Sequence, residues 1–172
     1  MRPLRGVALL GVLVLATALS ACGSSPRSAH PTGGAPSYFL KAIETGYPEM
    51  AYLPSRLPKG FRYDGSRTYT RSYDIYYDVK GIAFGTTFEM YQAPCRHFGH
   101  ARHTFVVNGR RVEWSTISGV QQAWLCLTTS DGHPFGLSAR AAVSGDRDLS
   151  TPRHRRDARR LATLVADALP AS

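Results

Sequence analysis

The residues best suited to chemistry are three histidines at intervals of three residues that follow Cys95. They are His97, His100 and His103. Imidazoles spaced by about one helical turn can share a face and bind zinc or copper. However, Gly99 weakens a helix, no nearby carboxylate would orient the rings, and Arg96 and Arg102 would repel a cation. We favour a solvated basic loop and keep the three histidines as weak metal candidates.

Signatures of nucleophilic or acid–base catalysis are scarce in the sequence. The serines that could act as nucleophiles, such as Ser115, Ser118 and Ser130, lie outside any GxSxG elbow. The carboxylates are scattered, and no two stand out as a glycosidase pair. The sequence contains no phosphate-binding loop, GxGxxG fingerprint or CxxC motif. We therefore expect a protein that is not an enzyme and that holds no cofactor.

Five arginines gather at the start of a helical pattern near the C-terminus. They are Arg153, Arg155, Arg156, Arg159 and Arg160. Positive charge at a helix N-terminus opposes the helix dipole, so these side chains would gain from a bound anion such as a lipid phosphate. We interpret the cluster as a solvated basic face and as a candidate anion-binding site.

A second basic segment combines arginine with tyrosine. Its tyrosines and arginines are Tyr63, Tyr69, Tyr73, Tyr76, Tyr77, Arg62, Arg67 and Arg71. Aromatic faces beside guanidinium groups can bind sugars or anionic polymers. Tyrosine is also an ordinary strand residue whose ring packs inward with its hydroxyl at the rim, and we favour this second interpretation.

The N-terminal residues have the layout of a secretory signal peptide. Residues 1–5 carry two arginines and no acid, and Gly6–Leu19 is an uncharged, mostly apolar stretch. A helix needs about 20 such residues to span a bilayer, so this stretch is too short for a lasting transmembrane segment. We expect the segment to direct export and then to be removed.

The apolar stretch ends in Leu19-Ser20-Ala21-Cys22, which resembles the lipobox of bacterial lipoproteins. The resemblance implies a diacylglyceryl group on Cys22 and cleavage before it, which removes residues 1–21. Two acyl chains anchor a protein stably, whereas one holds it only marginally. We expect a protein held by membrane lipid on the extracytoplasmic face of the cell membrane. Its abundant arginine and scarce lysine are typical of a GC-rich genome, such as that of an actinobacterium.

The lipid would also account for an odd number of cysteines. The chain has three. With Cys22 modified, Cys95 and Cys126 are left to pair in an oxidising compartment, and we predict a disulfide between them. The alternative is two separate buried thiols.

The chain carries a formal net charge of +9. An exported basic protein could reach anionic head groups or phosphate-bearing wall polymers. The charge could equally serve only to keep the protein soluble. We expect an envelope protein or an anionic wall polymer as partner, and no nucleic acid.

Composition divides the mature chain into a tether and one domain. Residues 22–36 comprise the lipidated cysteine and a Ser/Gly/Pro-rich stretch without large apolar residues, which predicts a flexible tether. Residues 37–172 have the length of one ordinary domain. It should begin with a short helix over Ser37–Thr45. The prolines of Tyr47–Lys59 then favour an extended segment.

From Gly60 onward the periodicity is closer to two, which predicts strands. The segments are Phe61–Tyr63, Tyr69–Val79, Ala83–Tyr91, Phe105–Val107, Arg110–Trp114, Gln122–Thr128 and Pro134–Ala139. Asn108-Gly109 is the preferred pair for a type I′ turn, so a hairpin should place Phe105 opposite Val112.

A final helix closes the predicted domain. Ser150 or Thr151 can cap it, and Pro152 suits its first position. Apolar residues keep to one face as far as Leu169, and Pro170 should end the helix. The predicted fold is α+β: an antiparallel sheet of five or six strands packed by the C-terminal helix, with a short N-terminal helix.

The order of these elements resembles extracytoplasmic domains of bacterial lipoproteins and anti-sigma-type sensors. The matching pieces are Leu57–Phe61, Val107–Gly109, the strand with Trp124 and the helix Leu161–Leu169. The resemblance implies this fold and no reaction. We therefore expect a non-catalytic binding or regulatory module of the cell envelope. The alternative is a small metal-binding protein or enzyme that uses the histidine loop.

Overall fold

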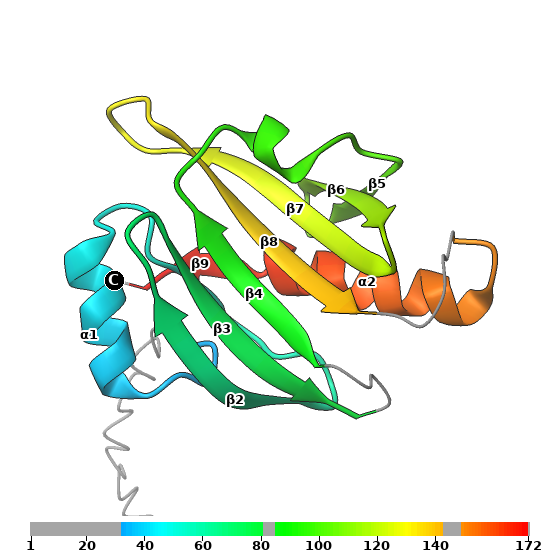
Figure 1. Ribbon diagram of the computed structural model, residues 1–172, viewed down its shortest axis with the longest axis horizontal. Coiled ribbons are helices and arrows are strands. Elements are labelled where there is room, and N and C mark those ends of the chain that lie inside the picture. The colour runs from blue at the N-terminus through cyan, green and yellow to red at the C-terminus, as the bar shows by residue number, and fades with distance from the viewer. Residues whose placement is uncertain (1–31, 81–84, 143–148, 172) are drawn as a thin grey trace, which may run out of the picture.

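The computed structural model describes residues 32–80, 85–142 and 149–171. Cys22, the lipobox and most of the expected tether lie outside the described residues, so the anchor stays a prediction. Figure 1 shows a twisted sheet with one long helix behind it and a shorter helix beside one edge. Neither helix of the described chain is long and apolar enough to cross a membrane.

The described residues form two α-helices, one short 3-10 helix and nine strands. In chain order these are α1 (Ser37–Gly46), β1 (Tyr52–Pro54), β2 (Phe61–Thr68), β3 (Ser72–Val79), β4 (Thr86–Tyr91), η1 (Cys95–Phe98), β5 (His103–Val107), β6 (Arg110–Ile117), β7 (Val120–Thr128), β8 (Pro134–Ala142), α2 (Pro152–Ala166) and β9 (Ala168–Pro170).

Seven strands form one antiparallel sheet in the order β2-β3-β4-β8-β7-β6-β5. The predicted α+β class is confirmed, since the sheet is antiparallel and the chain has a short N-terminal helix and a long C-terminal one. The expected five or six strands were too few. The seven strands of the sheet overlap the seven segments predicted as strands, with β2 and β5 at its edges.

A separate two-stranded sheet joins two segments that are far apart in the chain, with Leu53 of β1 opposite Leu169 of β9. The prediction that the last helix continues through Leu169 was therefore wrong, because α2 ends at Ala166. The pattern of Ala168 and Leu169 suits a helix or a strand. Pairing with a distant strand decides between them, and no local pattern reveals that pairing.

Local signals predicted two other elements correctly. Val107 pairs with Arg110 and Phe105 with Val112 across the hairpin of β5 and β6. Its turn residue Asn108 has a φ of 51°, as a type I′ turn requires. The helix α2 begins after Thr151, whose side chain accepts a hydrogen bond from a backbone N–H of the first turn.

One face of the sheet carries the core. Leu161 and Leu164 of α2 are buried there, and α2 packs against β5, β6, β7 and β8. The other end of the face is covered by α1, whose Phe39 ring lies 6.0 Å from that of Tyr73 on β3. The Tyr73 hydroxyl accepts the Tyr52 N–H at 2.8 Å, which ties β1 to the sheet.

Candidate functional site

The second face of the sheet, which we call the outer face, carries different groups over different strands. Tyr73, Ile75 and Tyr77 of β3 are buried on the core side. The alternate residues of each strand point to the outer face. This face is turned toward the viewer in Figure 1, where α2 lies behind the sheet.

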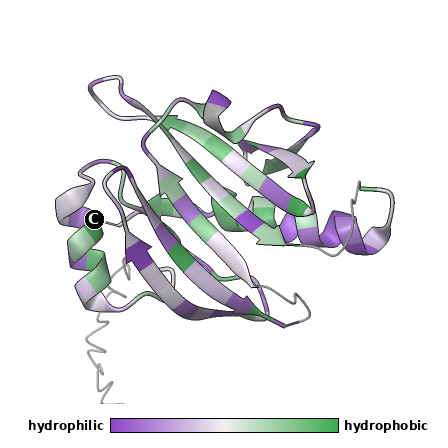
Figure 2. Cartoon of the chain, in the orientation of Figure 1, coloured by the Kyte–Doolittle hydropathy of each residue, from purple (hydrophilic) through white to green (hydrophobic). Residues whose placement is uncertain are grey.

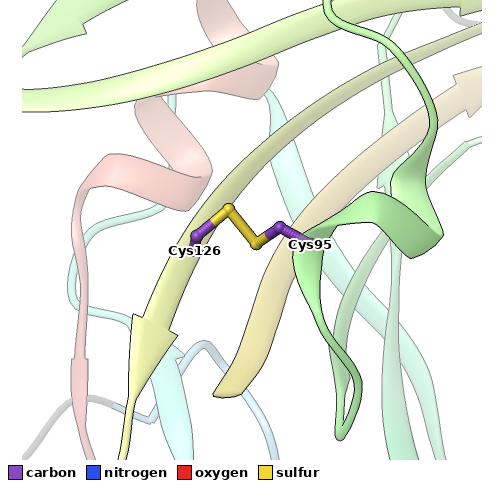
Figure 3. Close-up of a disulfide and its surroundings, with 2 residues drawn as sticks. All are labelled: Cys95 and Cys126. Atoms are coloured by element: carbon purple, nitrogen blue, oxygen red, sulfur yellow. A yellow bond between two sulfur atoms is a disulfide. The ribbon is translucent and has the colours of Figure 1, made fainter.

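The short helix η1 (Cys95–Phe98) and its disulfide, which together we call the clasp, cover the outer face over β7 and β8. Cys95 in η1 is bonded to Cys126 on β7, with Cα atoms 5.7 Å apart, as predicted (Figure 3). The clasp brings Phe98 to within 6.2 Å of Trp124, measured between ring centroids. Trp124 is therefore fully buried although it points away from the core. Gly136 makes room, since a Cβ there would lie 2.0 Å from the Phe98 ring.

The outer face over β3 and β4 carries carboxylates instead. Asp74 on β3 lies directly opposite Glu89 on β4, and Glu89 lies opposite Ser138 on β8. Like charges at directly opposed positions destabilise a sheet. The hydrogen bonds and charges around Asp74 and Glu89 therefore determine how far each carboxylate is stabilised.

Glu89 is well held. Its carboxylate forms an ion pair with Arg140 at 3.1 Å and accepts a hydrogen bond from the Ser138 hydroxyl at 3.1 Å. The Glu89 side chain is only 12% exposed, so water screens this charge-assisted contact little.

Asp74 is held less completely. Its Oδ2 accepts a hydrogen bond from the Tyr76 hydroxyl at 3.1 Å, but its Oδ1 is buried without a hydrogen-bond partner in the described chain. The residue is 8% exposed. Burial raises the pKa of the Asp74 carboxyl, and the Tyr76 hydrogen bond, the charge of Arg140, the Tyr69 hydroxyl and the charge of Arg67 oppose that rise. Leaving a buried acceptor unpaired costs about 1–3 kcal/mol, and more when it is charged.

A surface hollow of about 390 Å³ opens where these residues meet. Its lining residues are Tyr69, Thr70, Arg71, Ser72, Asp74, Glu89 and Tyr91. They belong to β3, β4 and the turn between β2 and β3. The volume falls within the range of about 300–1,000 Å³ typical of small-molecule sites. The hollow thus combines two carboxylates with two tyrosines and an arginine.

The turn that lines the hollow is held from two sides. The Tyr69 N–H donates to the Ser72 carbonyl at 2.8 Å. The buried Tyr47 hydroxyl donates to the same carbonyl at 2.6 Å and also contacts the Tyr69 carbonyl. Burial raises the pKa of Tyr47, which keeps this hydroxyl a donor. The Gln92 N–H, beyond the end of β4, donates to the Arg71 carbonyl at 2.8 Å. The turn is therefore held in place by the protein's own hydrogen bonds, so the shape of the hollow is formed in advance.

The carboxylate pair has two chemical uses. Asp74 can accept hydrogen bonds from a ligand's donors, because its Oδ1 lacks a partner. It can also serve as a proton donor beside an ionised neighbour, since burial favours its neutral form while Arg140 favours charge on Glu89.

The predicted histidine cluster does not assemble into a metal site within the described residues. In that part of the chain, no group of three or more His, Cys, Asp or Glu side chains could hold a metal ion. Cys95 is consumed by the disulfide. His100 is exposed, and the ring of His103 packs 5.5 Å from that of Trp114. The side chain of His97 lies outside the described residues.

The predicted arginine cluster lies on the first half of α2, which is mostly hydrophilic in Figure 2. Asp157 lies among these arginines, with its carboxylate 4.0 Å from Arg153 and 3.8 Å from Arg160. Arg155 donates to the Leu149 and Ser150 carbonyls just before the helix. Part of the charge is therefore used to hold the helix start.

The remaining two arginines of the cluster, Arg156 and Arg159, are exposed. They line a shallow hollow of about 210 Å³ together with Pro58, Arg160 and Thr163. Anion binding at this place stays a prediction.

Sequence reasoning missed the pairing of Asp74 with Glu89. Strand alternation alone puts each carboxylate on a polar face. The register between β3 and β4, in which Ile75 pairs with Phe88, brings the two together. A search for short motifs could not find the pair. Aligning the buried residues of the two strands with each other could have found it.

Comparison with known proteins identifies no relative. No family model, no curated protein and no solved structure matches the chain. The proposals below rest on the residues and their geometry.

Proposed function

We propose that this protein is a lipid-anchored, extracytoplasmic binding module of the cell envelope. Cys22 carries the lipid, residues 22–36 form the tether, and the domain that follows holds its ligand in the hollow over β3 and β4. Its partner is another envelope protein or a component of the cell wall. The module binds rather than catalyses.

The observation that carries this proposal is the buried Asp74 Oδ1, which has no hydrogen-bond partner among the described residues. An unpaired buried acceptor is costly to keep. Its position in the lining of a preorganised hollow suggests that a ligand supplies the missing donor. The lipobox sequence and the disulfide support the extracytoplasmic location, since disulfides persist in oxidising compartments.

The anchor is tested by replacing Cys22→Ser in the full chain. Cells that express the protein are fed an alkyne analogue of palmitate, and the label is measured on the purified protein. We expect the label to disappear from this variant and to remain when Cys95 and Cys126 are both replaced by serine. A label that survives Cys22→Ser would contradict the anchor.

Binding is tested by sedimenting the protein, solubilised in detergent, with purified cell envelopes. Asp74→Asn should reduce the bound fraction at least tenfold. Asp78→Asn is the matched control, because Asp78 lies on the same strand and face but is exposed and paired with Arg62. Equal binding by the wild type and both variants would contradict a ligand site at the hollow.

Acid–base catalysis is the second candidate function. The observation that favours it is the opposition of Asp74, whose pKa is raised by burial, and Glu89, which is paired with Arg140. Two carboxyl groups whose surroundings favour different protonation states are typical of general acid and base pairs. The protein would then release soluble fragments from purified envelopes over time, and Glu89→Gln would abolish the release. A binding module would release none.

A further inference from the structure

The hollow is specific in the kind of contact it offers. Asp74 and Glu89 supply carboxylate oxygens as acceptors, and Arg71 supplies guanidinium N–H groups as donors. A ligand that fits must therefore donate and accept hydrogen bonds over a short distance. Hydroxyl groups do both, since each has one O–H donor and two acceptor lone pairs.

The charges around the hollow favour a neutral ligand. An anion would face two carboxyl groups in the lining, those of Asp74 and Glu89, and each repels negative charge when it is ionised. A cation would be attracted by the same carboxyl groups, but Arg140, which is paired with Glu89, and Arg67, whose charge acts on Asp74, already balance their charge. A neutral ligand with several hydroxyl groups is not repelled by the charged groups around the hollow.

The aromatic lining adds an apolar surface. Tyr69 is 43% exposed and is one of five large hydrophobic residues that are exposed in the described part of the chain. The Arg67 guanidinium lies over one face of this ring, 5.1 Å from its centroid, so a ligand would stack on the other face. The C–H groups on one face of a pyranose ring are weakly electropositive and can stack on such a ring. Tyr91 lines the hollow as well.

We propose that the hollow formed by Tyr69, Asp74 and Glu89 is a binding site for an uncharged saccharide. Asp74 and Glu89 accept hydrogen bonds from the sugar hydroxyls, Arg71 donates to a ring or hydroxyl oxygen, and the Tyr69 ring stacks on the C–H face of the pyranose. This inference rests on the proposed binding function and names the chemistry of the ligand.

The test uses the lipidated full-length protein in a polyoxyethylene detergent, which has no sugar head group. The probes are neutral methyl pyranosides in the gluco, galacto, manno and N-acetylglucosamine series. Glucuronate, glucosamine and butylammonium serve as charged comparisons. Binding is detected by saturation-transfer NMR and its strength by calorimetry. We expect at least one neutral pyranoside to bind more tightly than any charged probe.

Two pairs of variants locate the site. Asp74→Asn should weaken binding of that pyranoside at least tenfold, whereas Asp78→Asn should leave it unchanged. Tyr69→Ala should weaken it about tenfold, whereas Tyr69→Phe, which keeps the ring, should retain most of the affinity. Tyr38→Ala is a control at an exposed tyrosine on α1. Circular dichroism and thermal melting of each variant separate loss of binding from loss of fold.

The outcomes separate this inference from the proposed function. If butylammonium or glucuronate binds in place of every neutral pyranoside, or if none of the pyranosides binds, the saccharide assignment is overturned. If Asp74→Asn nevertheless reduces binding to purified envelopes, the hollow remains the ligand site for a partner of another class. If neither pyranosides nor envelopes depend on Asp74, both proposals fail.

Discussion

The two halves of the outer face differ in how their side chains are covered. Over β7 and β8, the Cys95–Cys126 bond holds η1 against the sheet, and Trp124 becomes part of a second, small core. Over β3 and β4, the chain leaves a hollow lined by the carboxyls of Asp74 and Glu89. The covered half is arranged for stability. The hollow carries an unpaired polar atom, which is a cost that a binding site can justify.

The largest effect should come from removing the clasp. Replacing Cys95 and Cys126 with serine should lower the free energy of unfolding by about 3–4 kcal/mol, as expected for a loop closed across 31 residues. Trp124 should then meet water, and tryptophan emission should shift to the red. Urea unfolding and fluorescence measure both effects. An unchanged midpoint and emission would show that the clasp is not what covers this half.

The comparison predicts that the hollow should be insensitive to this change. In the protein without the disulfide, ligand binding should stay within about twofold of the wild type under folding conditions. A parallel loss of binding would show that the two halves are coupled through the sheet.

A smaller effect should come from adding one methyl group to each half. Gly136→Ala should cost about 1–3 kcal/mol, because its Cβ would overlap the Phe98 ring. Gly65→Ala is the matched change at a strand glycine on the outer face of the uncovered half, where the nearest atom would lie 3.7 Å away. It should be tolerated. Thermal melting of the two variants compares them, and equal destabilisation would contradict the difference in packing.

The smallest expected effect has the opposite sign. Burial raises the pKa of Asp74 in the folded protein, so the folded state binds this proton more tightly than the unfolded state. The resulting stability is present below the unfolded pKa of about 3.9 and is lost as pH rises through the folded pKa. At pH 7, Asp74→Asn should therefore stabilise the protein by about 1 kcal/mol.

The pH dependence checks this interpretation. At pH 3 the Asp74 carboxyl is protonated in both states, and the gain should disappear. Asp78→Asn, which breaks an exposed pair with Arg62, should change stability by less than about 0.5 kcal/mol at either pH. Urea unfolding at the two pH values measures the difference. Destabilisation by Asp74→Asn at pH 7 would mean that the contacts of the Asp74 carboxylate, such as the hydrogen bond from Tyr76, outweigh the cost of its burial.

Local physics explains which elements the sequence predicted. The turn at Asn108 and the cap at Thr151 are short-range features, so residue type and spacing were enough to place the hairpin and the start of α2. The disulfide followed from counting cysteines. The end of α2 was misplaced because pairing between β1 and β9 joins residues that are far apart in the chain.

The candidate site depended on long-range register. Asp74 lies in a strand that the sequence predicted, but nothing near it in the chain shows that Glu89 stands opposite. The turn that lines the hollow lies within the run expected as one strand from Tyr69 to Val79. The structure ends β2 at Thr68 and begins β3 at Ser72. Tertiary contacts from Tyr47 and Gln92 hold that turn, and local patterns do not reveal them.

The pairing of β1 with β9 has a consequence for the timing of folding. A chain that emerges from a ribosome or a translocation pore appears N-terminus first, so β1 is exposed long before its partner. Beyond β9, the Ala171 N–H donates to the Ala51 carbonyl at 2.7 Å, which extends this junction to the last described residue. The pairing of β1 with β9 can therefore form only after β9 itself has emerged. Until then β1 has no partner strand, so this junction is among the last parts of the fold to form.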